Sequence, residues 1–180
     1  YERSDLAETI AAYDLVNEPT LDGSATGKKQ WDVLDKLYDA IREIDTDHVI
    51  SIEGCWLFTN LPNPKKYDWQ NVLYQYHIYN WVYNILPNDI YFGMHWLTYR
   101  LSDHDVPKYI GEFNFFDQKE EWGKYLNEFD KRGFSWSIWS YKTISVGWWD
   151  SSWGLYVHRM NLKDEKLKLD VRTATYDEIY

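Results

Sequence analysis

The sequence predicts an α/β protein with a parallel sheet, because short apolar runs alternate with amphipathic helical segments along the chain. Five runs are typical of strands and occupy 12–16, 48–52, 72–78, 106–110 and 134–139. Their starts lie 24 to 36 residues apart, which is the spacing of successive strand-helix units. Polar residues gather at the carboxyl ends of the runs, where parallel sheets carry their functional groups. The chain has no repeat or internal linker, so we expect a single domain over 1–180.

Three helices are expected between the runs, each marked by apolar residues at three- and four-residue steps. The first lies within 27–45 and has the stripe Trp31, Leu34, Leu37, Tyr38, Ile41 and Ile44. The second precedes the fourth run and has the stripe Ile90, Met94, Leu97 and Leu101. The third precedes the fifth run and has Trp122, Leu126 and Phe129, a capping box of Asp117 and Glu120, and a stop at Gly133. The proline-containing segment 54–71 is expected to be a long loop with little helix.

The composition excludes several classes of partner. The chain has 29 Asp and Glu against 19 Lys and Arg, a net charge of −10, which disfavours nucleic acids and anionic membranes. No apolar run is long enough for a membrane span, and a single cysteine, Cys55, excludes an internal disulfide framework. The aromatic content is high, with 11 Trp, 16 Tyr and 7 Phe. Flat amphipathic rings suit a surface that stacks sugars, although core packing accounts for about half of them.

Two glutamates at the ends of runs are candidates for acid and nucleophile chemistry. Cleavage of a glycosidic bond needs one proton donor and one ionised carboxylate that face the same bond. Glu18 precedes Pro19, whose ring disfavours a helical conformation before it, so we expect Glu18 to be held extended at the tip of the first strand. Glu112 follows an apolar run and Gly111, and a glycine lets other groups approach closely. The other acidic residues are expected to be mostly solvated surface charges.

A histidine and a tyrosine are expected to act as a pair. His77 and Tyr79 lie two residues apart on one run, so their side chains share a face of the sheet. The other four histidines are expected to be ordinary core residues: His48, His95, His104 and His158. No His or Cys cluster has the spacing of metal ligands and no Gly-x-Ser-x-Gly motif occurs, so we expect no metal, no other cofactor and no serine nucleophile.

Four segments, taken together and in order, resemble motifs of one enzyme family. They are Tyr13-Asp14-Leu15-Val16-Asn17-Glu18-Pro19, Tyr76-His77-Ile78-Tyr79, Ile110-Gly111-Glu112-Phe113 and Trp136-Ser137-Ile138-Trp139-Ser140-Tyr141-Lys142. In order and spacing they resemble the motifs on strands four, six, seven and eight of glycoside hydrolase family 5, the cellulases and mannanases with retaining (β/α)8 barrels. The resemblance spans nearly the whole chain and implies a partial (β/α)8 TIM barrel of about five parallel strands.

The resemblance also implies roles for single residues. Glu18 would be the acid/base, Glu112 the nucleophile, and Asn17 the partner of the sugar 2-hydroxyl. His77 and Tyr79 would orient and tune the two carboxylates. Trp139 would be the platform under the sugar before the scissile bond. Four more tryptophans are candidates for extending this platform, with loop packing as the alternative: Trp56, Trp81, Trp148 and Trp149.

The chain departs from the family pattern at its start. About 11 residues precede the first strand, so three barrel strands are missing, together with an arginine and a histidine that family members carry on them. An open five-stranded sheet leaves two unpaired edge strands and, we expect, an apolar inner face exposed to water. We therefore expect a homodimer in which two partial barrels cover each other's open side. The alternative is that the chain is part of a longer enzyme.

We interpret the sequence as an endo-β-1,4-glucanase acting on cellulose-like or mixed-linkage glucan by double displacement. Glu18, kept protonated by the negative charge of Glu112, would donate to the leaving oxygen while Glu112 attacks the anomeric carbon. Two alternatives stay open: a mannanase or xyloglucanase of the same family, and an inactive half-barrel that only binds carbohydrate. The resemblance further implies that the protein acts outside the cell.

Overall fold

The computed structural model describes residues 8–20, 26–116, 118–144, 153 and 156–158. Its main feature is a sheet of five parallel strands in the order β1-β2-β3-β4-β5. The strands are β1 (Ala12–Asp14), β2 (Val49–Glu53), β3 (Val72–Tyr79), β4 (Lys108–Asn114) and β5 (Ser135–Trp136). Because the order in the sheet equals the order in the chain, each strand lies beside the next one along the sequence. The predicted parallel α/β fold is confirmed.

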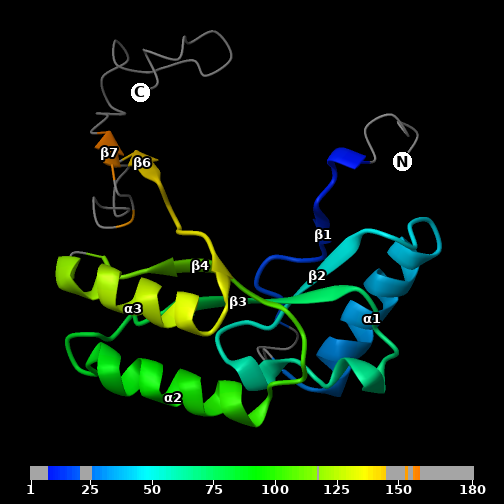
Figure 1. Cartoon of the computed structure of the whole chain (residues 1–180), viewed down its shortest axis with the longest axis horizontal. Helices are drawn as coiled ribbons and strands as arrows, with labels where there is room; N and C mark the ends of the chain where they lie inside the picture. Colours follow the sequence, from blue (N-terminus) through cyan, green and yellow to red (C-terminus); the bar gives the residue numbers. More distant parts are fainter. Residues whose placement is uncertain (1–7, 21–25, 117, 145–152, 154–155, 159–180) are drawn as a thin grey trace, which may run out of the picture.

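Three helices cover one side of this sheet. They are α1 (Lys28–Arg42), α2 (Asn88–Leu101) and α3 (Lys119–Lys131). Figure 1 shows α2 and α3 below the sheet and α1 beside β2, and none of the helices in the described residues covers the upper side between β1 and β6. The segment after β2 contains only two short 3-10 turns, η2 (Phe58–Asn60) and η3 (Pro64–Lys66), so the predicted long loop is confirmed. The helices and alternate strand residues form one aromatic-rich core, which includes Leu34, Ile50, Tyr76, Ile78, Phe92, Phe113 and Phe129.

The predicted stripe is correct in part for α1, since Ile44 lies beyond the end of the helix and is 68% exposed, and it is wrong for α2. On α1, Leu34 and Tyr38 are buried against the sheet. On α2, the expected stripe is the solvent side of the helix, with exposed fractions of 46% to 72% for Ile90, Met94, Leu97 and Leu101. The core side carries Phe92, Trp96 and Tyr99 instead. Both sides of α2 are apolar, and the larger aromatic side chains occupy the core because they bury more surface.

The ends of the third helix differ slightly from the expectation. The residue that precedes α3 is Gln118, which makes no side-chain capping hydrogen bond, and the expected cap Asp117 lies outside the described residues. The helix ends at Lys131, and Gly133 has a φ of 69°, in the left-handed region that glycine adopts readily. The predicted helix stop at Gly133 is therefore confirmed.

The face of the sheet away from the helices is polar, which corrects the expectation of an apolar inner face. Gln75 donates a hydrogen bond from Nε2 to Asp14 Oδ2 at 3.2 Å and accepts one at Oε1 from Ser51 Oγ at 3.3 Å. Glu53 and His77 lie on the same face, and both are 1% exposed. Strand residues alternate between two faces, and the apolar residues Ile50, Tyr76 and Ile78 point to the core on the helix side. The open side is thus lined by polar side chains that hydrogen-bond to one another.

The two edges of the five-stranded sheet are β1 and β5. Beside β1 lies a groove of about 560 Å³ that is largely apolar and is lined by Ala12, Tyr13, Asp14, Leu15, Leu37, Ala40, Ile41, Ile44 and Asp45. At the other end of the molecule, β6 (Lys142–Ile144) and β7 (Tyr156–His158) form a separate parallel pair. Among the described residues, no helix combines the length and the apolar character needed to cross a membrane.

Candidate active site

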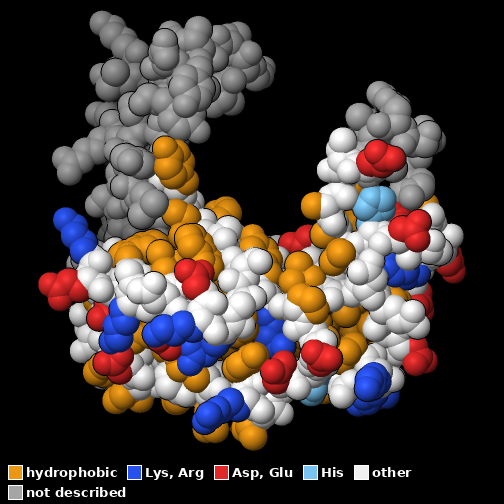
Figure 2. All heavy atoms as spheres, viewed as in Figure 1, with side chains coloured by type: hydrophobic (Ala, Val, Ile, Leu, Met, Phe, Trp, Pro, Cys, Tyr) orange, Lys and Arg blue, Asp and Glu red, His pale blue; other side chains and the backbone are white. Residues whose placement is uncertain are grey.

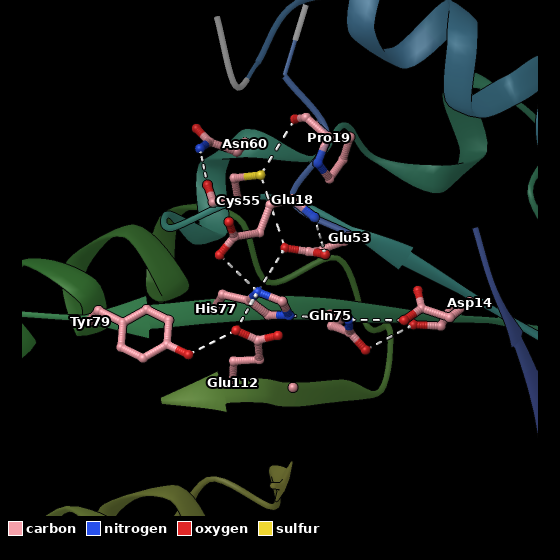
Figure 3. Close-up of polar contacts among 12 residues, drawn as sticks. Asp14, Glu18, Pro19, Glu53, Cys55, Asn60, Gln75, His77, Tyr79 and Glu112 are labelled. Carbon is pink, nitrogen blue, oxygen red and sulfur yellow. Dashed lines mark hydrogen bonds and ion pairs between the residues drawn. The ribbon is translucent and has the colours of Figure 1, made fainter. Parts of the chain in front are cut away.

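Three carboxyl groups surround one nitrogen of His77. The Nδ1 atom lies 3.1 Å from Glu18 Oε1, 3.3 Å from Glu53 Oε1 and 3.4 Å from Glu112 Oε2. Figure 3 shows the three side chains converging on the ring from different segments. Glu18 follows β1, Glu53 ends β2, His77 lies on β3 and Glu112 on β4. The carboxyl halves of neighbouring parallel strands therefore bring these groups together.

The tautomer of His77 follows from its neighbour on the strand. Gln75 Nε2 lies 3.3 Å from His77 Nε2, and its hydrogen bonds to Asp14 and Ser51 fix which end of the amide faces the ring. An amide nitrogen can only donate, so His77 Nε2 accepts. The neutral ring then carries its proton on Nδ1, directed at the carboxyl groups. Through this hydrogen bond, Asp14 and Gln75 determine that the ring proton of neutral His77 lies on Nδ1 and points toward the three carboxyl groups.

A shift in strand register places Glu112 opposite His77. The pairing of β3 with β4 shifts after Tyr76 and Ile110, and it skips Gly111. A Cβ atom at position 111 would lie 2.7 Å from Gln75 Cδ, closer than real Cβ atoms approach. The predicted close approach at Gly111 is confirmed. The extra residue brings Glu112 to the polar face instead of the core.

Tyr79 holds the Glu112 carboxylate from the side. Its hydroxyl donates a hydrogen bond to Glu112 Oε2 at 2.7 Å. Burial and the hydrogen bond to the Glu112 carboxylate raise the pKa of the Tyr79 phenol, so Tyr79 remains a donor across the physiological pH range. The Glu112 side chain is 17% exposed, enough to reach a substrate while its geometry is fixed by two partners.

Glu18 adopts a conformation that the sequence did not predict. Its φ is 44°, in the left-handed region, and not the extended conformation expected before Pro19. The Glu18 N–H donates to Glu53 Oε2 at 2.7 Å, and the Pro19 carbonyl accepts hydrogen bonds from Gln30 Nε2 at 2.8 Å and from Cys55 Sγ at 3.4 Å. These bonds offset the cost of the strained backbone. The Glu18 side chain is 40% exposed and so faces the open side of the sheet.

Glu53 belongs to the cluster although sequence reasoning did not single it out. It is 1% exposed, and it contacts both the Glu18 backbone and His77. A signal was available, since Glu53 ends an apolar run and stands next to Gly54, much as Glu112 stands next to Gly111. The prediction missed Glu53 because a single glutamate after a strand is usually solvated.

The remaining predicted residues lie around this cluster. Asn17 is exposed beside Glu18. Trp139 is 49% exposed, its backbone N–H donates to the Phe113 carbonyl at 3.2 Å, and its backbone carbonyl accepts from Asn114 Nδ2 at 2.7 Å. Trp56 is 44% exposed and its carbonyl accepts from His95 Nε2 at 2.9 Å, depending on the His95 tautomer. Two further candidates lie outside the described residues: Trp148 and Trp149.

A group of aromatic rings continues from Tyr79 away from the carboxyl cluster. The Trp81 ring is 58% exposed and lies 5.0 Å from the rings of Tyr79 and Trp153, and 5.8 Å from that of Phe116. Phe116 in turn stacks on Tyr83 at 6.0 Å. Figure 2 shows that further hydrophobic side chains gather on the surface beside the hollow above the sheet. Trp81 therefore has both the exposure and the support that a stacking platform needs.

The arrangement is suited to proton transfer combined with nucleophilic attack. One oxygen of Glu18, one of Glu112 and one nitrogen of His77 all lie within 4.8 Å of one another. The hydrogen bond of His77 Nδ1 with Glu18 Oε1 and the 3.4 Å contact of the same nitrogen with Glu112 Oε2 account for this spacing, so we assign the cluster to proton chemistry. One carboxyl group can hold a proton while the other attacks an electrophilic carbon between them.

Comparison with known proteins identifies relatives of this fold. The family model described as cellulase (glycosyl hydrolase family 5) matches residues 7–145. Among solved structures, endo-glycoceramidase II from Rhodococcus sp. in a cellobiose-like isofagomine complex is 21% identical, with a TM-score of 0.56. The match covers 84% of this chain and 38% of that one. A search of curated proteins gives no match.

Two other solved structures show the same fold. Thermotoga maritima Cel5A in complex with cellobiose substrate, in mutant form, is 22% identical with a TM-score of 0.55, over 79% of this chain and 50% of that one. The cellulose synthase subunit Z of Clostridioides difficile is 18% identical with a TM-score of 0.56, over 81% and 55%. The chain thus spans between 38% and 55% of the length of these structures, and its five strands correspond to part of a (β/α)8 barrel.

Proposed function

Since the chain belongs to glycosyl hydrolase family 5, we propose that it is a retaining endo-β-1,4-glucanase. The observation that carries the proposal is the position of Glu18 and Glu112, whose nearest oxygens lie within 4.8 Å on either side of His77. Retaining glycosidases have carboxyl groups about 5 to 5.5 Å apart, whereas inverting ones leave room for a water molecule between them. The short separation supports retention.

In the proposed first step, Glu112 attacks the anomeric carbon and forms a covalent glycosyl-enzyme. Tyr79 orients the attacking carboxylate through the 2.7 Å hydrogen bond to Oε2. At the same time Glu18 gives its proton to the oxygen of the departing sugar, so that the leaving group departs as an alcohol.

In the second step, Glu18 takes a proton from water, and the water oxygen attacks the same anomeric carbon. The bond to Glu112 breaks, and Glu112 leaves as a carboxylate. Two displacements at one carbon restore the original configuration.

The proposed substrate is a β-glucan chain that lies across the open polar face. Hydroxyl-rich sugars match the hydrogen-bonding side chains on that face, and exposed rings such as Trp139 and Trp81 can stack on sugar faces. Two of the similar structures are named as complexes with cellobiose or a cellobiose-like isofagomine, and we extend that class of ligand to this chain as part of the proposal.

The proposal is tested with a panel of soluble polysaccharides. The purified chain is incubated with carboxymethyl cellulose, mixed-linkage β-glucan, glucomannan and xyloglucan, and new reducing ends are measured. We expect the fastest release from the two unbranched glucans. A preference for glucomannan or xyloglucan would move the chain to another specificity of the family. Binding without release would assign it to carbohydrate binding alone.

We also propose that the chain forms a twofold homodimer through the open side next to β1. Two features support this: β1 is an edge strand of the five-stranded sheet, and the groove beside it is lined by the apolar side chains of Leu37, Ile41 and Ile44. In a complete barrel another strand-helix unit would cover such a groove. A second copy offers the same apolar groove, which suits an isologous interface.

The dimer prediction is checked by light scattering coupled to size exclusion at micromolar concentration. We expect twice the mass of the chain for the wild type and the mass of one chain for Ile44→Asp, because Ile44 is 68% exposed in the groove. The matched control is Leu97→Asp, which changes a 58% exposed side chain on α2 and should leave the dimer intact. A monomeric wild type would contradict the proposal, and loss of the dimer in Leu97→Asp alone would move the interface to α2.

A further inference from the structure

Glu53 is a buried carboxyl group to which the proposed reaction assigns no step. Its side chain is fully enclosed between β1, β3 and the loop that follows β2. One oxygen accepts the Glu18 N–H at 2.7 Å, and the other lies 3.3 Å from His77 Nδ1. Such a group is expensive to bury unless it is paired with a cation or holds a proton.

The cluster contains fewer donors than its carboxyl groups need. His77 Nδ1 has one N–H for three carboxyl groups, and its shortest contact is with Glu18 Oε1 at 3.1 Å. Glu112 has the additional hydroxyl of Tyr79. Among the side chains that the structure describes, no Lys or Arg makes an ion pair with any of the three glutamates. Glu53 accepts the Glu18 N–H and lies 3.9 Å from the Cys55 thiol, but unlike the partly exposed Glu18 and Glu112 it has no contact with solvent that could stabilise a negative charge.

We propose that Glu53 is a positioning residue for the acid/base Glu18. The side chain of Glu53 accepts a hydrogen bond from the backbone N–H of Glu18, and the Glu53 carboxyl group is itself protonated. The inference rests on the proposed function in that Glu18 acts as the acid/base. If Glu53 is neutral, the negative charge among the three glutamates around His77 is carried by Glu18 and Glu112 alone. An ionised Glu53 would add a second anion beside Glu18 and compete with it for the His77 N–H.

The electrostatics of the site agree with this assignment. Burial and the negative charges of Glu18, Asp14 and Glu112 together raise the pKa of Glu53 to about 8, against the opposing effect of the hydrogen bond from the Glu18 N–H. The thiol of Cys55, 3.9 Å from Glu53 Oε1, adds no charge, because burial raises its pKa to about 12. Among the described residues, His77 and Tyr79 are the other titratable groups that interact with Glu53. Glu53 therefore stays protonated up to about pH 8, far above the ordinary range of a glutamate.

A carbon-13 NMR titration of glutamate side-chain carboxyl groups tests the protonation directly. The probe is the full chain labelled at glutamate, and the resonance of Glu53 is identified by its loss in Glu53→Gln. We expect it to titrate near pH 8 in the wild type and in the control Glu120→Gln, which changes an exposed glutamate on α3. Titration of the Glu53 resonance below about pH 6 overturns the proposal. If Glu53→Gln fails to fold, the carboxyl resonance of Glu53 is assigned in the wild type through its connection to the Glu53 backbone amide, and the same titration is then measured.

The pH dependence of kcat/KM on soluble β-glucan tests the positioning role. Gln keeps the acceptor for the Glu18 N–H and is neutral, so Glu53→Gln should retain activity within about fivefold below pH 7, whereas Glu53→Ala should lose about a hundredfold. Above pH 8 the logarithm of kcat/KM should fall with a slope of about −2 in the wild type and about −1 in Glu53→Gln, because one titrating group is gone. Equal slopes would overturn the role, as would equal losses in the Gln and Ala variants.

The two measurements separate this inference from the proposed function. If the wild type releases no reducing ends, the glucanase proposal fails, but the NMR titration still reports whether Glu53 carries a proton. If hydrolysis is present and Glu53 titrates like an ordinary glutamate, only the inference about Glu53 fails.

Discussion

Replacing Glu112 by Gln is expected to reduce the hydrolysis of soluble β-glucan by at least about 10⁴-fold, since the variant has no nucleophile. Gln is close to Glu in size and shape, and its amide oxygen can still accept the hydrogen bond from Tyr79, so the site should keep its shape. Loss of kcat with a nearly unchanged KM is the expected pattern, because sugar binding depends on the aromatic rings and the polar face. Initial rates of reducing-end release over a range of substrate concentrations measure both constants.

The matched control for this variant is Glu120→Gln, an exposed glutamate on α3 at the other side of the sheet. It removes the same charge from the protein and should leave the rate within about twofold of the wild type. If wild type and Glu112→Gln release reducing ends equally, Glu112 is not the nucleophile. If neither releases any and both bind β-glucan equally well, the chain is a carbohydrate-binding half-barrel.

Replacing Glu18 by Ala should affect substrates according to the quality of their leaving group. Unactivated β-glucan needs a proton on the departing oxygen, so its hydrolysis should fall by roughly 10²- to 10⁴-fold. An aryl cellobioside with an acidic phenol leaves without a proton, so formation of the glycosyl-enzyme should be slowed much less. A rapid burst of phenol followed by slow turnover is the expected time course, because water then attacks without a general base.

Azide provides the decisive addition to the Glu18→Ala experiment. It is a small anion that needs no general base, so it should restore turnover of the aryl cellobioside and give a β-glycosyl azide. A β product requires two displacements and therefore the covalent intermediate on Glu112. An α-configured azide would contradict retention. Absence of any azide effect together with a wild-type profile would remove Glu18 from the acid/base role.

The order of the elements could be predicted from the sequence because each depends on short-range pattern. The alternation of strands and helices and the stripe of α1 with Leu34 and Tyr38 needed only local periodicity. Local pattern failed on α2, because both faces of this helix are apolar and the buried face is the one whose side chains fill the space between the helices and the sheet. Phe92 stacks on Tyr125 of α3 at 4.1 Å, a contact between helices that no window of sequence contains.

The candidate site shows the same division between local and distant information. Motifs brought Glu18, His77 and Glu112 to attention, because each stands in a recognisable short segment. The role of Glu53 and the left-handed backbone of Glu18 depend on one hydrogen bond between residues 35 apart in the chain. The proline rule correctly describes an isolated dipeptide, but a buried carboxyl acceptor contributes more than that preference.

The polar lining of the uncovered side has a consequence for how such a protein can change over time. The glutamates and the histidine of the cluster all come from one continuous stretch between residues 18 and 112. Whatever covers the far side contributes walls to the groove, whereas the proposed bond-breaking groups are already assembled. The catalytic cluster and the segments that cover the open side can then change independently in evolution. Replacing the covering segments would alter how many sugar rings fit and would leave the cluster of Glu18, His77 and Glu112 unchanged.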